Sequence, residues 1–218
     1  MSESKKYFSL WILLVCILVF IFQQIIPGFT ETFLLTSDAI TKPWQFLTSI
    51  FLHGSLAHLA YNMFALVFFG LILESMIGSK KFLLLFILSG ILANIVSFPF
   101  YESSLGASGA IMGVLACVAV LRPMMTVWAF GMIMPMFILA IIWAAGSFLG
   151  IFGFGDQGTG YIAHLGGLVI GTLYGFYLRF FRIKRENQEQ KGIRVYNFSN
   201  KIQIPEEDMR KWEDRFMK

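Results

Sequence analysis

The sequence predicts an all-α polytopic membrane protein with six transmembrane helices. Its 218 residues are 57% hydrophobic and 14% charged, whereas soluble domains are about 45–50% apolar and about 25% charged. Six apolar runs approach the roughly 20 residues that a helix needs to cross a bilayer. The charges lie mostly outside these runs, and 11 of the 17 Lys and Arg residues fall at or after Arg179. These features exclude an ordinary soluble enzyme, a disordered chain and a nucleic-acid-binding module.

The six predicted spans divide the chain into a membrane core and two termini. The spans are roughly 8–26, 55–77, 82–99, 108–121, 126–149 and 160–181. The fourth span is short, and the fifth contains Pro135, which predicts a kink or a tilted helix there. Residues 1–7 are then a short N-terminal segment, residues 8–181 the core, and residues 182–218 a charged tail.

The first span raises the question of a signal peptide, because Lys5 and Lys6 precede it. Its apolar region is too long for one, and Gln23, Gln24 and Pro27 follow without a small-residue cleavage site. We therefore interpret it as a retained transmembrane helix.

The positive charges also predict the orientation of the chain in the membrane. When the segments between spans are assigned alternately to the two sides of the membrane, one side holds 16 of the 17 Lys and Arg residues. The other side consists of residues 27–54, 100–107 and 150–159, and it holds only Lys42. Both termini are therefore expected in the cytoplasm and these three segments outside. Since no transit segment is visible, the expected location is a prokaryotic plasma membrane.

The tail ends in a segment with helical features. Pro205 suits a first helical position, and acidic residues follow it in the first turn. Met209, Trp212 and Phe216 then form one apolar stripe. We expect a solvated or surface-lying helix, with a helix that docks on a partner as the alternative.

Strongly polar residues inside the predicted spans indicate a functional site, because they are costly in a membrane. They are His58, Asn62 and Glu74 in the second span, Asn94 in the third, Ser108 at the start of the fourth and His164 in the sixth. At 1.5 Å per residue, Ser108, His58 and His164 lie within roughly 6 Å of one another in depth. Asn62 is four residues after His58 and shares its helix face. Three helices thus bring polar groups to one level near the outer surface.

This set of residues has a chemical interpretation. Ser108 becomes a nucleophile if the His164 imidazole takes its proton. His58, Asn62 and the Ser108 backbone N–H can stabilise an oxyanion. Asp156 is the nearest candidate for a third member, although nothing in the sequence fixes its position.

Glycines support the same arrangement. Gly106 and Gly109 permit a tight turn into the fourth span. Gly167, Gly171 and Gly175 repeat every four residues, which lets helices approach closely. Glu74 lies at the other membrane face, where an architectural hydrogen bond is expected.

A metal site is not expected. His53 and His58 are five residues apart, about 140° around a helix, and no His-Glu-x-x-His sequence is present. Cys16 and Cys117 both fall inside apolar runs and form no disulfide framework.

Three segments together resemble the rhomboid family of intramembrane serine proteases. They are FLHGSLAHLAYN at 51–62, GASG at 106–109 and AHLGG at 163–167. Their order and their places on the spans match the family, over residues 8–181.

The resemblance implies a six-helix rhomboid-like bundle with a Ser108–His164 dyad and no acidic third member. By position, His58 and Asn62 stabilise the oxyanion and His53 lies near the entrance that retains water. Glu74 ties helices and a loop together. The implied activity is cleavage of membrane proteins in or beside their transmembrane segments, with a substrate helix approaching where the second and fifth spans meet. No metal or organic cofactor is implied.

Two positions depart from the family pattern. Many members have Trp-Arg in the first outer segment, whereas this chain has Trp44-Gln45. Some members have a tyrosine four residues after the serine, stacked on the base histidine, and this chain has Met112 there. Neither change removes a catalytic group.

Two other functions remain as alternatives. A catalytically silent rhomboid-like protein would bind membrane clients and tolerate loss of Ser108. A small transporter would need polar residues lining both halves of the core, but the cluster is confined to the outer half. The expected partners are membrane-protein substrates and the lipid bilayer, and the sequence does not indicate an oligomeric state.

Overall fold

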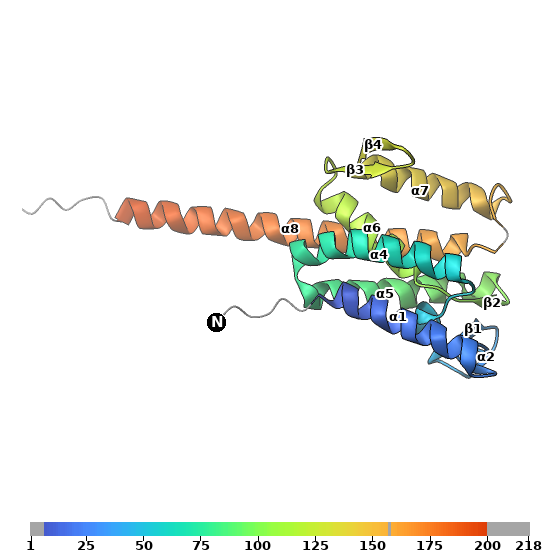
Figure 1. The fold of residues 1–218 in the computed structure, drawn as a ribbon. Helices are drawn as coiled ribbons and strands as arrows, with labels where there is room; N and C mark the ends of the chain where they lie inside the picture. The colour runs from blue at the N-terminus through green and yellow to red at the C-terminus, as the bar shows by residue number, and fades with distance from the viewer. Residues whose placement is uncertain (1–6, 157, 200–218) are drawn as a thin grey trace, which may run out of the picture. The chain divides into compact units, whose positions relative to one another are not determined.

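The computed structural model describes residues 7–156 and 158–199, with side chains up to residue 181. The chain divides into two compact units, Met1–Leu178 and Arg179–Lys218. The first unit contains the candidate site and is shown with the rest of the chain in Figure 1.

The first unit is a bundle of apolar helices, which confirms the predicted polytopic α-helical membrane fold. Within the described part of the chain, four helical segments are long and apolar enough to cross a membrane: Phe8–Ile25, Leu56–Ile77, Ser79–Phe100 and Tyr161–Phe181. The corresponding helices are α1 (Phe8–Ile25), α4 (Leu56–Ile77), α5 (Ser79–Ser97, continued by the 3₁₀ turn η2, Phe98–Phe100) and α8 (Tyr161–Ser199). Two shorter apolar helices, α6 (Ser108–Leu121) and α7 (Met136–Ile151), complete the bundle.

The fifth predicted span is wrong in its first half. Residues 126–135 form an antiparallel hairpin of β3 (Thr126–Ala129) and β4 (Met132–Pro135), and α7 begins only at Met136. Phe130 and Gly131 both have positive φ, which is the backbone of a tight hairpin turn. Pro135 has an extended conformation at the N-cap of α7, so it precedes the helix instead of kinking it.

The sixth helix is longer than its apolar span. The prediction ends it near residue 181, but α8 continues to Ser199. Residues 182–199 are rich in Arg, Lys, Glu and Gln, which are good helix formers. The helix predicted from Pro205 onward lies outside the described residues.

Helix α6 is the centre of the core. Every residue from Gly109 to Ala119 is buried, because α6 packs among α4, α5 and α7. By contrast, α1 and α7 each bury few residues and expose large apolar side chains. Such exposed apolar surface suits contact with lipid.

The connection between α1 and α4 is folded. It contains α2 (Phe29–Phe33), β1 (Leu35–Thr36), α3 (Gln45–Thr48) and the 3₁₀ turn η1 (Ser49–Phe51). Strand β1 pairs antiparallel with β2 (Ser103–Ser104), which lies just before α6. The first long connection is thereby tied to the segment that leads into Ser108. We call this end of the bundle the Ser108 end.

Candidate functional site

Ser108 is the first residue of α6 and is half-buried. The preceding Gly106 has a φ of 125°, and its N–H donates to the Ser49 carbonyl at 2.9 Å. A Cβ on Gly106 would lie 2.8 Å from Cε1 of the His58 ring. Only glycine therefore combines this backbone with the close approach of His58.

Helices α6 and α8 approach closely because glycines face each other. A Cβ on Gly109 would lie 3.4 Å from the Ala163 carbonyl oxygen, and one on Gly167 would overlap the Gly109 carbonyl. Gly171 meets the Gly113 carbonyl in the same way. Ser108 and His164 are the chain neighbours of Gly109 and Ala163. The glycine contact thus brings the serine and the histidine to the same level of the bundle.

His164 is buried in the first turns of α8, with 7% of its surface exposed. The Tyr161 ring lies edge-on to its imidazole, with centroids 6.2 Å apart. Within the described residues, its buried Nδ1 has no hydrogen-bond partner. Asp156 is exposed and instead accepts a hydrogen bond from the Thr159 hydroxyl. The structure therefore does not bring Asp156 to His164 as a third member.

His58 and Asn62 lie on one face of α4, in its first two turns. Ser55 caps this helix by accepting a hydrogen bond from the His58 N–H at 3.1 Å. The Asn62 amide donates to the His58 carbonyl at 3.0 Å. This bond uses one amide hydrogen, so the second remains to serve as a donor.

His53 lies just before α4 and is 1% exposed. The Gln23 side chain of α1 holds its backbone in both directions, accepting from the His53 N–H and donating to the His53 carbonyl. The rings of His53 and His58 meet edge-on, 5.2 Å apart. Burial, with a smaller contribution from His58, lowers the pKa of His53 to about 4, so its ring is neutral at pH 7.

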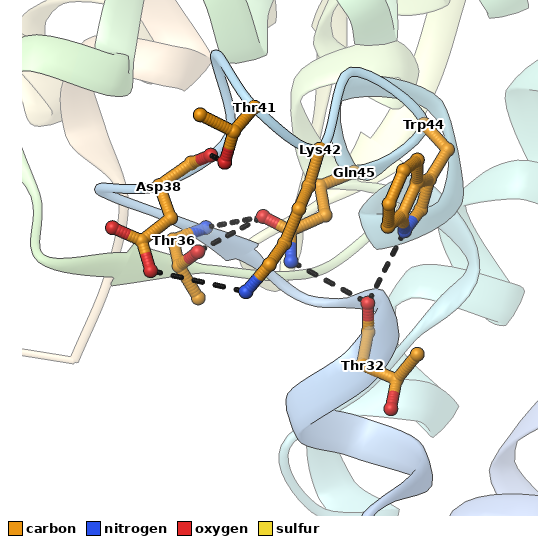
Figure 2. Close-up of polar contacts among 7 residues, drawn as sticks. All are labelled: Thr32, Thr36, Asp38, Thr41, Lys42, Trp44 and Gln45. Carbon is orange, nitrogen blue, oxygen red and sulfur yellow. Dashed lines mark hydrogen bonds and ion pairs between the residues drawn. The ribbon is translucent and has the colours of Figure 1, made fainter.

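Gln45 anchors the segment that carries these residues. Its side chain is fully buried, and its Oε1 accepts hydrogen bonds from the N–H and the hydroxyl of Thr36 in β1. Its Nε2 donates to the Thr32 carbonyl, which also accepts from Trp44 (Figure 2). A neutral amide therefore holds this segment through hydrogen bonds to β1 and to the end of α2.

A second set of buried hydrogen bonds joins this segment to α5 and to Gly106. Asn94 donates to the Phe46 carbonyl and to the Ser49 hydroxyl, both at 2.9 Å. The Ser49 hydroxyl donates to the Gln45 carbonyl, and the Ser49 carbonyl accepts from Gly106. Asn94 thus joins a helix to a connecting segment, and the chain of bonds leads to within two residues of Ser108.

Glu74 lies at the other end of the bundle, away from these residues. Its carboxylate accepts hydrogen bonds from the Phe8 N–H, the Ser9 N–H and the Ser9 hydroxyl at the start of α1. It caps that helix and joins α1 to α4.

Sequence reasoning missed four residues that shape the site. Gln23, Ser49 and Tyr101 act through contacts with backbone groups. For example, the Tyr101 hydroxyl accepts a hydrogen bond from the Ile162 N–H. No sequence spacing signals such contacts. Tyr161 had a detectable signal, because it lies three residues before His164 and shares its helix face.

Among the described residues, no group of three His, Cys, Asp or Glu side chains is placed to hold a metal ion. The buried Cys16 and Cys117 are both free thiols. The candidate site brings together a serine, histidines, an asparagine and backbone groups, which suit acyl transfer.

The chain is similar to known proteins of one family. The family model described as Rhomboid domain matches residues 41–181. Rhomboid protein 1, mitochondrial, from Saccharomyces cerevisiae is 34% identical over 158 residues, 66% of this chain and 44% of the relative. The Rhomboid protease GluP of Bacillus subtilis is 38% identical over 124 residues, 52% of this chain and 24% of the relative.

Rhomboid-like protein 11, chloroplastic, from Arabidopsis thaliana is 32% identical over 162 residues, covering 68% of this chain and 57% of the relative. The chain therefore spans less than two thirds of each of these three relatives. The family-model match covers the site-bearing segments and most of the helical bundle. The chain belongs to the rhomboid family.

Proposed function

We propose that this protein is an intramembrane serine endopeptidase that cleaves transmembrane or juxtamembrane segments of other membrane proteins. The observation that carries the proposal is the glycine contact between α6 and α8, which brings Ser108 and His164 to one level. The name of the relative GluP, a rhomboid protease, adds support.

The proposed reaction follows from the residues at the Ser108 end. Ser108 attacks the carbonyl carbon of the scissile bond while His164 accepts the hydroxyl proton. His164 then returns the proton to the leaving amine, and water hydrolyses the acyl-enzyme with His164 again as the base. Among the described residues no acid bonds the His164 imidazole, so packing against Tyr161 orients it.

The oxyanion needs hydrogen-bond donors aimed at it in a low-dielectric site. The proposed donors are the His58 ring, the second amide hydrogen of Asn62 and the backbone N–H of Ser108. Gly106 admits the His58 ring, and Gly109 and Gly167 admit the neighbouring helix. His53 packs edge-on against His58 and helps to hold the His58 ring in place.

A substrate helix is proposed to approach between α4 and α7. On α4 near the site, Leu56, Tyr61 and Phe64 are each at least 70% exposed, which offers an apolar surface to a transmembrane segment. The substrate must unwind locally, because its peptide bonds are otherwise hydrogen-bonded within the helix. Helix-breaking residues in the substrate therefore favour cleavage.

The proposed orientation places the Ser108 end outside the cytoplasm. The connections at that end hold only Lys42 of the 17 Lys and Arg residues. Water needed for hydrolysis would then come from the outer face of a plasma membrane.

The test is cleavage of a panel of tagged single-span substrates by the purified protein in liposomes. We expect Ser108→Ala and His164→Ala to lower the rate by about 10⁴-fold and a chelator to leave it unchanged. Ser75→Ala is the matched control, because Ser75 is an exposed serine that bonds only the Ile72 carbonyl of its own helix. Cleavage that survives in the Ser108→Ala protein would refute the mechanism.

A further inference from the structure

The β3–β4 hairpin between α6 and α7 is apolar on both faces. Residues 126–135 include no charged side chain. Val127 and Met134, which pair across the strands, are buried in the core. Trp128 and Ile133, the next pair along, point the other way and are 72% and 73% exposed. An exposed apolar face of this kind needs a partner other than water.

The hairpin lies along α7 instead of projecting away from it. At its base, the Met136 N–H donates to the Met125 carbonyl at 2.8 Å. At its tip, the Phe130 ring is 6.3 Å from the ring of Trp143, which lies seven residues into α7, or about 10 Å from its start. Figure 1 shows the two strands beside the first turns of α7.

The exposed face of the hairpin therefore lies beside a helix that also exposes apolar side chains. On α7 these include Ile141 and Phe148, which are 59% and 54% exposed. The 16 residues of α7 span about 24 Å, less than the roughly 30 Å of a hydrocarbon core. Helix α6 is also short, but protein surrounds it. Helix α7 is exposed, and the hairpin adds apolar surface beside its first turns.

We propose that the exposed face of the hairpin, formed by Trp128 and Ile133 with Phe130 at the tip, inserts into the bilayer interface at the end opposite Ser108. Its partner is lipid. This inference rests on the membrane fold and does not depend on the proposed protease activity.

Two physical arguments place the hairpin at the interface and not in the hydrocarbon core. A two-stranded hairpin leaves the outer edge of each strand without a neighbour, and unsatisfied backbone groups cost several kcal/mol each in the core. Aromatic side chains such as Trp128 and Phe130 prefer the headgroup level. The exposed Arg122 at the base of the hairpin is suitably placed for headgroup phosphates.

The experiment uses the full chain, with tryptophans other than Trp128 replaced by phenylalanine, reconstituted in phosphatidylcholine vesicles. Lipids brominated near the carbonyl and lipids brominated deep in the acyl chain serve as depth probes, and iodide probes the aqueous phase. We expect the shallow bromines to lower Trp128 emission about twofold and the deep bromines to lower it less. Iodide should have little effect.

Strong quenching by iodide with none by brominated lipid would overturn the proposal. So would protection from both probes, which would mean that another polypeptide covers the face. If the multiple replacement does not fold by circular dichroism, the difference between the native protein and Trp128→Phe gives the same information. Ile133→Asp should halve the lipid quenching, whereas Ser103→Asp, exposed in β2 at the Ser108 end, should leave it unchanged.

Discussion

The two ends of the bundle are held together in different ways. At the Ser108 end, buried polar side chains bond to backbone groups of the connecting segments, as Gln45 does to Thr36 and Asn94 does to Phe46. At the other end, Glu74 caps α1, and the α6–α7 connection is an apolar hairpin. At the Ser108 end, hydrogen bonds hold irregular backbone in a defined shape. At the other end, hydrogen bonds from Glu74 hold a helix start, and apolar contact holds the hairpin.

The largest expected effect comes from the helix contact that serves the Ser108 end. In Gly171→Ala the new methyl group meets the Gly113 carbonyl, so α6 and α8 must separate. We expect a loss of about 3 kcal/mol in the free energy of unfolding and at least a tenfold loss of any cleavage activity. Thermal unfolding in detergent measures the first effect.

The matched control for this change is Gly146→Ala. A Cβ on Gly146 of α7 meets nothing within 4 Å, so the protein should gain about 0.5–1 kcal/mol from helix propensity. Equal destabilisation by both changes would mean that the α6–α8 contact is not specially tight.

The next effect concerns the anchor of the first connection. Gln45→Leu leaves the N–H and hydroxyl of Thr36 without their acceptor. We expect a loss of about 2 kcal/mol and slower cleavage, although Ser108 and His164 are untouched. Gln24→Leu is the control, because Gln24 is exposed on α1; it should change stability by less than about 0.5 kcal/mol. Indistinguishable variants would show that the anchor does not stabilise the fold.

A third effect depends on pH. The pKa of His53 is about 4 in the fold and about 6.5 in the unfolded chain. The unfolded chain therefore binds more protons between these values, and stability is lost as the pH falls below 6.5. At pH 5.5 the loss relative to pH 7.5 is about 1 kcal/mol.

This part of the pH dependence should be absent in His53→Gln. Unfolding midpoints measured at pH 7.5 and 5.5 for both proteins provide the comparison. His58 is the titratable group that faces His53, so His58→Gln measures how much His58 contributes to this pH dependence. An unchanged pH dependence in His53→Gln would contradict a neutral buried His53.

The smallest effect concerns the surface of the Ser108 end. Lys42 and Asp38 form an exposed ion pair with a distance of 3.8 Å (Figure 2). Lys42→Gln should lower stability by less than about 0.5 kcal/mol, and the difference should vanish in high salt. A larger loss would mean that charge, as well as the amide of Gln45, holds this segment.

The helices and the polar residues at one level were predictable because both follow from local pattern. The lengths of the apolar runs predict the spans, and the helical rise per residue predicts the depths of Ser108 and His164 in the membrane. The hairpin at 126–135 was not predictable, because a short apolar run is compatible with either a helix or a strand. Its signals were Gly131 at the turn and Pro135 at the end of the second strand.

The anchoring residues could not be predicted for a different reason. The family resemblance marks Gln45 as a departure from the Trp-Arg pattern, but two of its partners are backbone groups, the Thr36 N–H and the Thr32 carbonyl. Nearly every residue type carries a backbone N–H and a carbonyl, so nothing in the sequence indicates these contacts. Tyr161 is the opposite case, since its spacing from His164 alone placed the two on one helix face.

The polar clamps on α1 have a consequence for how the protein is made. Glu74 holds the start of this helix, and Gln23 near its end holds the backbone of His53. Both partners are translated after α1, and the family-model match begins only at residue 41. Because Glu74 belongs to α4, the clamp at the start of α1 can close only after α4 has been synthesised, whereas the clamp at Gln23 needs the chain only as far as His53.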